Sequence, residues 1–194
     1  MNASAIRENS STTGIHPLKF TLWVLIMSII MMFAAFTSAY IVRRDEGNWL
    51  EFDLPNGLIT NSIIIIVSSL TMQWAYYAAK KDNLNSLKIS LLATLGLGLA
   101  FLLGQWNVWG ELVNNKIFFG GPTSNPSGSF LYVLTGVHGF HLITGLIFLL
   151  ILIGAAFRYN VHSKNMLRIE LCTTYWHFLS VLWVYLYVFL AVYH

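Results

Sequence analysis

Five long apolar runs, separated by short polar stretches, dominate this chain of 194 residues. They cover residues 18–42, 57–79, 86–110, 129–157 and 169–193. Each run reaches the roughly 20 residues that an α-helix needs to cross a hydrocarbon core about 30 Å thick. A lone spanning segment must satisfy its backbone hydrogen bonds internally, so all five are predicted to be helices. The pattern therefore predicts an all-α, integral membrane bundle of five transmembrane helices over residues 18–194, preceded by a polar tail over residues 1–17.

The composition agrees with a chain that faces lipid. Apolar residues make up 56% of it and charged residues only 10%, whereas soluble domains carry about 25% charged residues. The single cysteine, Cys172, provides neither a disulfide framework nor a CxxC pair. The first run is too long for the apolar region of a signal peptide, so it is expected to be retained. Residues 120–128 (GGPTSNPSG) are predicted to be a loop because of their turn chemistry.

The basic residues predict how the bundle is oriented. One predicted side of the membrane carries only Arg43, Arg44 and Lys116. By the positive-inside rule the N-terminus is then cytoplasmic and the C-terminus lies outside. Because the basic residues lie between apolar runs and form no single patch, they indicate a membrane and no nucleic-acid partner. The other side carries the remaining basic residues, which are Arg7, Lys19, Lys80, Lys81, Lys88, Arg158, Lys164 and Arg168.

Polar groups inside the spans are the candidates for function, because each is costly in hydrocarbon. The first three spans have no ionisable group near their middles, which argues against a proton pump or ion channel made by this chain alone. In the fourth span His138 and His141 are three residues apart and share one helical face. In the last span, helical spacing places Glu170, Thr174 and His177 on one face. Thr173 and Ser180 lie alongside that face.

Two interpretations of these side chains are open. In the first they are structural ties that hydrogen-bond between the fourth and fifth spans, with Glu170 as a partner, each bond contributing about 1 kcal/mol. In the second the histidines ligate a metal or haem. A bis-histidine haem needs ligands at matching depth on facing helices, and only His177 faces the other two. The first interpretation is favoured, with no catalytic, cofactor-binding or metal-binding residue. It assigns the structural role to His138, His141, Glu170, Thr174 and His177.

Small and aromatic residues add two expectations. Trp49, Trp106, Trp109 and Tyr40 fall near the outer ends of spans, as an interfacial aromatic belt does. Aromatic residues surround the last span, which indicates contact with its own bundle and with another protein. Glycines allow close helix packing, or alternatively a groove that holds lipid. They occur in the third and fourth spans at Gly96, Gly98, Gly104, Gly136, Gly139 and Gly145.

Four segments carry a resemblance to a known family. They are residues 131–141 (LYVLTGVHGFH) with Gly145, residues 175–187 (YWHFLSVLWVYLY), residues 61–72 (NSIIIIVSSLTM) and residues 23–40 (WVLIMSIIMMFAAFTSAY). In that order they resemble the TGxHGxH segment, the last helix, the NT…SS pattern and the opening helix of haem–copper oxidase subunit III. Glu170 also lies shortly before residues 175–187, as the family's glutamate lies before its last-helix motif. The short bacterial forms of this family have five helices.

The resemblance implies a non-catalytic accessory subunit of a terminal respiratory oxidase in a bacterial cytoplasmic membrane. Cytochrome c oxidase is favoured, and a quinol oxidase or the nitric oxide reductase relative is the alternative. Haem and copper are expected in partner subunits and not in this chain, and a bound phospholipid is expected in a cleft between helix groups. The expected partners are subunit I as the main contact, subunit II, other respiratory complexes and membrane lipids. The expected role is to support the stability and proton uptake of subunit I.

Two positions depart from the family pattern. Ile29 follows Ser28 where the family usually has a buried carboxylate, and Ser180 stands where it usually has an aspartate. Both changes remove buried charge and weaken any idea of a proton antenna in this chain. Two other classes compete with the oxidase subunit: a haem b membrane anchor and a small transporter. A transporter predicts inverted repeats and broken helices, and five spans do not divide into equal halves.

Overall fold

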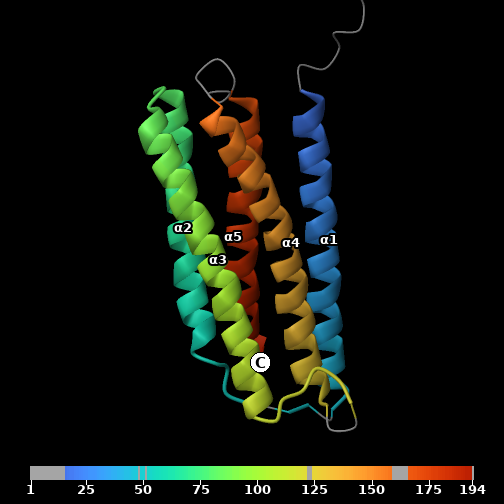
Figure 1. Ribbon diagram of the computed structural model, residues 1–194. Helices are drawn as coiled ribbons and strands as arrows, with labels where there is room; N and C mark the ends of the chain where they lie inside the picture. The colour runs from blue at the N-terminus through green and yellow to red at the C-terminus, as the bar shows by residue number, and fades with distance from the viewer. Residues whose placement is uncertain (1–15, 48, 51, 122–123, 159–165, 194) are drawn as a thin grey trace, which may run out of the picture.

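The computed structural model describes residues 16–47, 49–50, 52–121, 124–158 and 166–193, and over these residues it contains five helices and no strand (Figure 1). All five are long and apolar enough to cross a membrane, so the predicted all-α fold is confirmed. Most of the predicted polar tail, residues 1–15, lies outside the described residues. The helices are α1 (Pro17–Asp45), α2 (Gly57–Lys80), α3 (Leu84–Asn114), α4 (Pro126–Phe157) and α5 (Leu167–Tyr193).

The start of α4 corrects the predicted loop over residues 120–128. The helix begins at Pro126, where the missing N–H of proline costs nothing because the first turn of a helix has no partner for it. Asn125 caps the helix, since its side-chain oxygen accepts a hydrogen bond from the Ser127 backbone N–H at 3.1 Å. The same Asn-Pro-Ser residues that signal a turn therefore also signal a helix start, and the loop is shorter than predicted.

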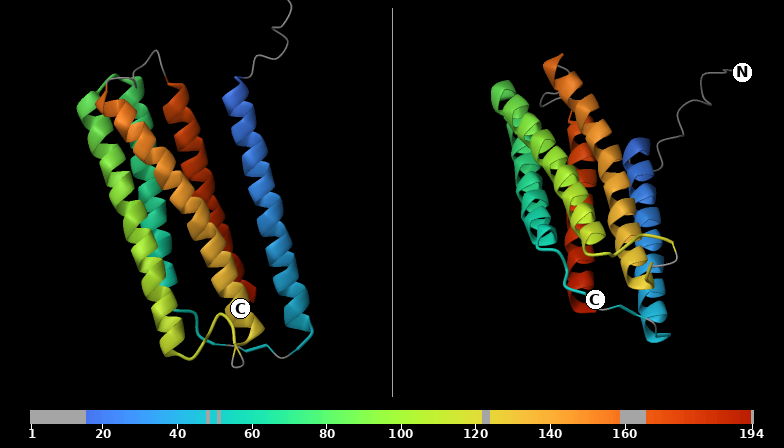
Figure 2. Two further views of the ribbon diagram at one scale, coloured as in Figure 1. Left: turned by 45° about the vertical axis from the view of Figure 1, so that its right-hand side comes forward. Right: turned by 60° about the horizontal axis from the view of Figure 1, so that its bottom comes forward.

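Helix α5 lies at the centre of the bundle, packed against α1, α2 and α4. Helices α2 and α3 form a close pair, and α3 also packs on α4. Figure 2 shows α1 at one edge of the bundle and the α2–α3 pair at the other. Across the described residues α1 packs on α4 and α5 and on neither α2 nor α3. The central position of α5 accounts for aromatic side chains on most of its sides, because most of them face helices of the same chain.

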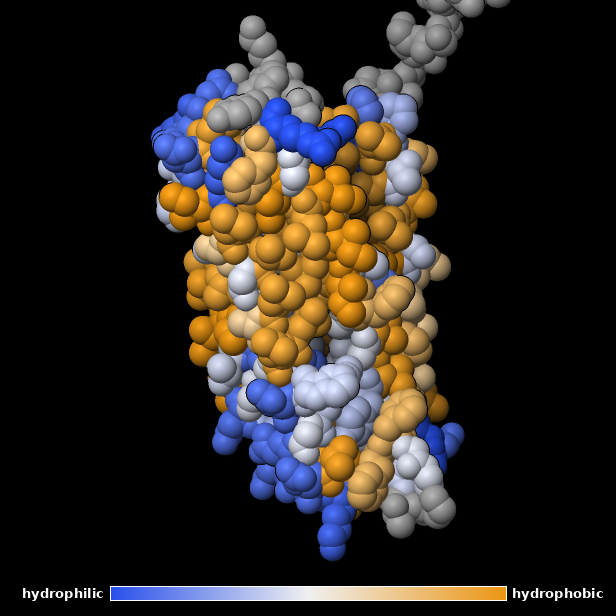
Figure 3. Space-filling model, in the orientation of Figure 1, coloured by the Kyte–Doolittle hydropathy of each residue, from blue (hydrophilic) through white to orange (hydrophobic). Residues whose placement is uncertain are grey.

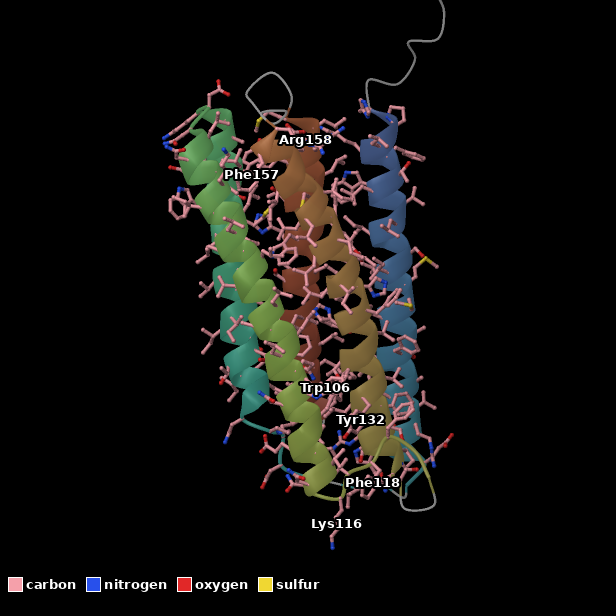
Figure 4. The ribbon with its side chains drawn as sticks, viewed as in Figure 1. Trp106, Lys116, Phe118, Tyr132, Phe157 and Arg158 are labelled. Atoms are coloured by element: carbon pink, nitrogen blue, oxygen red, sulfur yellow. The ribbon has the colours of Figure 1, made fainter. Side chains whose placement is uncertain are left out.

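On the face shown in Figure 3, apolar residues cover the middle of the bundle and form an apolar band, and hydrophilic residues gather at both ends. We call the end at which α1 begins the N-terminal end and the end at which α5 finishes the C-terminal end. In Figure 4 Arg158 lies at the N-terminal end and Lys116 at the C-terminal end. The two ends of the described chain thus lie on opposite sides of the apolar band, as five spans require. That the N-terminal end is cytoplasmic stays a prediction from the charges.

Aromatic packing holds the second half of α1 against the bundle. The Tyr40 ring is fully buried and contacts Trp49, Phe130 and Phe189, with centroid separations of 4.8, 5.7 and 5.2 Å. The expectation that Tyr40 belongs to an interfacial belt is therefore wrong, because this ring faces its own chain. Trp106, with 72% of its surface exposed, is placed as a belt residue is (Figure 4).

The first part of α1 is held much less firmly. The buried residues of α1 all lie from Ile26 onward. Leu18, Phe20 and Trp23, on the turns before it, expose large apolar side chains. Helix α1 is therefore anchored towards the C-terminal end of the bundle and stands away from α2 at the N-terminal end.

Candidate functional site

Two buried tryptophans of α5 bind to serines of α2. The indole N–H of Trp176 donates to the Ser68 hydroxyl at 3.0 Å, and that of Trp183 donates to the Ser62 hydroxyl at the same distance. Both indoles are 1% exposed, so their N–H groups need a partner inside the protein. Each serine supplies one within the close contact between α2 and α5.

His177 continues this seam of polar contacts. Its Nε2 lies 2.8 Å from the Gln73 side-chain oxygen, and its Nδ1 is hydrogen-bonded to the Ser69 hydroxyl. An amide oxygen only accepts, so Nε2 carries the hydrogen and Nδ1 accepts the hydroxyl proton of Ser69. Both ring nitrogens are thus used, and both partners are on α2. The expectation that His177 binds α4 is wrong.

Helices α2 and α3 are joined by two further side-chain bonds. The Asn61 amide donates to the Gln105 carbonyl oxygen at 3.3 Å with both residues buried, and the Thr71 and Thr94 hydroxyls lie 2.8 Å apart. Gly104 permits the first of these, because a Cβ at that position would lie 2.1 Å from the Asn61 Oδ1. Close backbone approach and the amide pair therefore depend on each other.

His138 of α4 is completely buried without making the predicted hydrogen bond. Its ring lies against Phe101 of α3 and Trp183 of α5, with centroid separations of 5.8 and 5.0 Å. Among the described residues neither ring nitrogen has a hydrogen-bond partner. His138 therefore connects α3, α4 and α5 through ring packing. The hydrogen bond predicted for it is not found among the described residues.

His141 also differs from the expectation. Its Nδ1 lies 2.8 Å from the Val137 carbonyl oxygen one turn earlier in α4, and its ring packs beside Phe33 of α1 at 6.0 Å. Helices α4 and α5 are joined instead through the Thr144 and Tyr175 hydroxyls, 2.9 Å apart, and the Tyr175 hydroxyl also lies 3.5 Å from the His141 backbone carbonyl oxygen, to which it donates. A threonine–tyrosine pair thus replaces the expected histidine contacts between these helices.

Glu170 and Thr174 take part in a pocket at the N-terminal end. The Glu170 carboxylate forms an ion pair with Lys19 of α1, and no histidine among the described residues forms one with it. Glu170, Thr174 and His177 line one cavity of about 510 Å³ bounded by α1, α2 and α5. The predicted shared face of these three residues is therefore confirmed, although it is turned towards α1 and α2. Their role in the assembled protein is taken up below.

The two departures from the family pattern fit an uncharged interior. Ile29 is buried in the apolar core. Ser180 is also buried, and its hydroxyl donates to the Trp176 carbonyl oxygen at 2.9 Å in its own helix. A buried carboxylate needs a paired cation, and neither the described contacts nor an ion pair of the described residues supplies one at these two positions, so the neutral residues match their surroundings.

The described side chains offer little to a metal ion. No group of three or more His, Cys, Asp or Glu residues among them is arranged to hold one. Binding of haem iron by His177 would break its bond to Gln73 or to Ser69. His138, enclosed by aromatic rings, would have to move out of its packing. The arrangement favours the contacts between helices over the haem interpretation.

Sequence reasoning missed several partners in this network. Ser69, Gln73 and Gln105 were not candidates, and Lys19 was treated only as a charge that orients the chain. The signal for the serines was present, because the small polar residues of 61–72 recur at helical spacing within an apolar run. Helical spacing shows which face of its own helix a residue lies on but does not show which residue of another helix it contacts. Only the packing of the helices reveals which groups form hydrogen bonds with one another.

The fold and the network define a class of protein: a multi-pass membrane subunit whose buried polar groups are largely engaged in contacts between its own helices. The family model described as cytochrome c oxidase subunit III matches residues 50–194. The chain belongs to the cytochrome c oxidase subunit III family. It is therefore a subunit III of a haem–copper oxidase, a multi-pass protein of the bacterial cytoplasmic membrane and part of an oxidoreductase complex.

Individual relatives include both branches of oxidases. The chain is 28% identical over 177 residues to cytochrome bo(3) ubiquinol oxidase subunit 3 from Buchnera aphidicola subsp. Schizaphis graminum, covering 88% of this chain and 90% of that one. The protein of the same name from subsp. Baizongia pistaciae is 30% identical, with 86% and 87% covered. Cytochrome c oxidase subunit 3 from Rattus norvegicus is 27% identical over 188 residues, with 88% and 67% covered.

Replacing His177 with leucine tests the seam between α2 and α5. The variant leaves the Ser69 hydroxyl and the Gln73 carbonyl oxygen without their shared partner. At about 1 kcal/mol per interhelical bond, we expect a lower yield of assembled oxidase and an unchanged haem spectrum in the complex that remains. The matched control is His141→Leu, which removes a bond within one helix. A changed haem spectrum at normal yield in His177→Leu would contradict this.

Proposed function

We propose that this chain is a non-catalytic accessory subunit of a cytochrome c oxidase, with its N-terminus in the cytoplasm. It packs mainly against subunit I, also meets subunit II, and holds phospholipid at its surface. In this role it supports the stability and proton uptake of subunit I while haem and copper stay in the partner subunits. His177 acts as a structural tie through hydrogen bonds, and Glu170 and Thr174 act through the pocket they share.

The observation that carries this proposal is how the buried polar groups are used. Trp176, Trp183 and His177 of α5 donate to side chains of α2, and Asn61 of that helix donates to Gln105 of α3. These bonds hold helices together, and the indole and amide groups among them do not gain or lose protons near neutral pH, so they are poorly suited to relay protons. With neutral Ile29 and Ser180 in the core, support for proton uptake comes through packing and lipid around subunit I.

The outward faces of the bundle support a partner or lipid role. Trp23, Met27 and Met31 of α1 expose 58, 57 and 71% of their surfaces on one side of that helix. Exposed side chains of this kind are normal in lipid and also suit a neighbouring subunit. Helix α1 lies at an edge of the bundle (Figure 2), and the exposure of these side chains shows that no other described helix covers this face.

Gentle purification through a tag on this chain tests the proposal. We expect subunits I and II to copurify, with the haem spectrum and copper of a cytochrome c oxidase, and the isolated chain to be colourless. Mass identification and an absorption spectrum check both points. Recovery of the chain without any haem–copper subunit would overturn the accessory role, and a haem spectrum from the chain alone would favour the haem b anchor.

A quinol oxidase is the second candidate, favoured by one observation. This chain covers 90% of the ubiquinol oxidase subunit from Buchnera aphidicola subsp. Schizaphis graminum but 67% of the cytochrome c oxidase subunit from Rattus norvegicus. The purified complex separates the two candidates when it is supplied with reduced cytochrome c or with a quinol. Oxygen consumption with cytochrome c supports the first candidate. Consumption with quinol alone replaces it with the second and leaves the accessory role intact.

A further inference from the structure

A groove of about 400 Å³ runs along the outer surface of the bundle between α3 and α4. Trp106 of α3, labelled in Figure 4, and Phe140 of α4 line it with 72 and 64% of their surfaces exposed. On the α4 side a Cβ added to Gly139 would meet no described atom within 4 Å, so the backbone there is open to an occupant. Small-molecule sites have volumes of about 300–1,000 Å³. The groove is therefore large enough for one flat ring between aromatic side chains.

Gln105 brings a buried, unused hydrogen-bond donor to this groove. Apart from Gln105, the described residues of the lining are leucine, isoleucine, glycine, phenylalanine and tryptophan. Gln105 is 2% exposed, its Oε1 accepts from Asn61, and its Nε2 has no partner among the described residues. The indole N–H of Trp109 is already used, because it donates to the Thr135 hydroxyl at 3.1 Å. Because an unpaired buried amide costs free energy, an occupant with an acceptor at this point gains a hydrogen bond.

The depth of Gln105 decides which acceptor can reach it. Gln105 lies six residues past the middle of α3 (Leu84–Asn114), which is about 9 Å along the helix. The hydrocarbon core extends about 15 Å on either side of its centre, so the amide lies inside it when α3 spans the membrane centrally. Acyl chains carry no acceptor within the hydrocarbon, and the backbone carbonyls of a neighbouring helix are bonded inside that helix. A carbonyl on an apolar ring is the acceptor that fits this depth.

We propose that this groove binds a membrane quinone, a flat ring with two carbonyls and an isoprenoid tail. One ring carbonyl accepts from the Gln105 Nε2, and the ring lies over Gly139 between Trp106 and Phe140. The tail stays in the surrounding bilayer. Such binding goes beyond the accessory role, and it places a quinone beside the oxidase whichever electron donor the complex uses.

Photolabelling of the assembled oxidase tests this assignment. The purified complex is illuminated with a ubiquinone analogue that carries an azide on its ring, and the labelled peptides of this chain are located by mass spectrometry. We expect label in the segments of α3 and α4 that line the groove, residues 102–109 and 136–143. A quinone site in another subunit labels other peptides and does not interfere. Absence of label from both segments overturns the assignment, whether an acyl chain or a partner helix covers the groove.

Two variants test the donor and the open floor of the groove separately. Gln105→Met keeps the length of the side chain and a weak sulfur acceptor for Asn61, but it has no N–H to donate. Label per haem should fall about fivefold, which is the effect of one neutral hydrogen bond. Gly139→Leu projects a side chain into the groove and should abolish labelling. Its control is Gly96→Leu, where an added Cβ is equally free of described contacts but lies outside the groove, and the label should stay.

Two small rings of the same shape show whether the carbonyl is recognised. Duroquinone and durene are both tetramethyl-substituted six-membered rings, and only duroquinone has carbonyls. We expect duroquinone to displace the azide label from this chain at a concentration about fivefold lower than durene does. Equal displacement would show that the groove accepts any apolar ring, and it would overturn the quinone assignment. Full displacement by dioleoyl phosphatidylglycerol would overturn it in favour of an acyl chain.

Unchanged labelling in both Gln105→Met and Gly139→Leu would also remove the site. Each measurement is made on complexes in which this chain copurifies with haem. A negative result therefore removes the quinone site while the accessory role stands.

Discussion

Replacing Trp176 with alanine is expected to release this subunit from its oxidase at a markedly lower temperature. The indole is among the largest fully buried side chains and donates to Ser68. It also fills the space over two glycines, since a Cβ at Gly98 or Gly145 would lie 2.9 or 3.4 Å from its ring atoms. Losing this ring opens a cavity where α2, α3, α4 and α5 approach one another, at a cost of about 3 kcal/mol or more.

Two variants distinguish the effect of losing the Trp176 ring from the effect of losing its hydrogen bond, and from a general effect of removing a tryptophan. Trp176→Phe keeps most of the aromatic volume and leaves Ser68 unpaired, so its effect should be about 1 kcal/mol. Trp106→Ala removes a ring that is largely exposed on the outside of the bundle and should leave assembly nearly unchanged. Subunit retention is measured by thermal dissociation of the purified complex. An equal fall in the dissociation temperature in Trp176→Ala and Trp106→Ala would show that the buried Trp176 ring contributes no more to assembly than an exposed tryptophan does.

The helices could be predicted from the sequence because a membrane leaves few alternatives. Apolar runs of sufficient length must be helices in lipid, and the observed bounds of α2 lie within one residue of the predicted ones. The start of α4 was missed because Asn125 and Pro126 serve both as turn residues and as a helix cap and first turn. A turn and a helix N-terminus favour the same residue types, and only the helix that follows distinguishes one from the other.

The partners of the polar residues could not be predicted in the same way. Helical spacing places Glu170, Thr174 and His177 on one face, and this was correct. Which helix that face meets depends on the packing order, and α5 turns it towards α1 and α2. The predicted contact with α4 assumed that consecutive helices share their polar groups. Here the central helix instead pairs with a helix more than one hundred residues earlier, through His177 and Ser69.

The histidines of α4 show a second limit. His138 and His141 are one turn apart, yet one ring is enclosed by Phe101 and Trp183 and the other bonds its own backbone. A histidine in an apolar run predicts a polar partner because an unpaired nitrogen is costly. Ring packing with aromatic neighbours is a further possibility that residue spacing does not reveal. The pattern thus drew attention to two residues in the bundle and predicted the wrong contacts for both.

Replacing Gly104 with alanine should separate α2 from α3. The new Cβ would lie 2.1 Å from the Asn61 Oδ1, far inside contact distance. Asn61 is buried and donates to Gln105, so rotating it away strands two amides inside the membrane. Overpacking costs about 1–3 kcal/mol, and the lost amide pair adds to that. We expect a strongly reduced yield of assembled oxidase, measured as subunit recovered per haem.

The same glycine offers an internal control and a rescue. Gly96→Ala lies in the same helix, where a Cβ meets nothing within 4 Å, and should have little effect. The double variant Gly104→Ala with Asn61→Ala removes the clashing side chain, and part of the lost yield should return. Recovery in the double variant beyond that of Gly104→Ala alone measures the coupling between these positions. The Asn61→Ala variant alone completes the comparison. If the loss of yield in the double variant equals the sum of the losses in Gly104→Ala and Asn61→Ala, the close approach of α2 and α3 at Gly104 does not depend on Asn61.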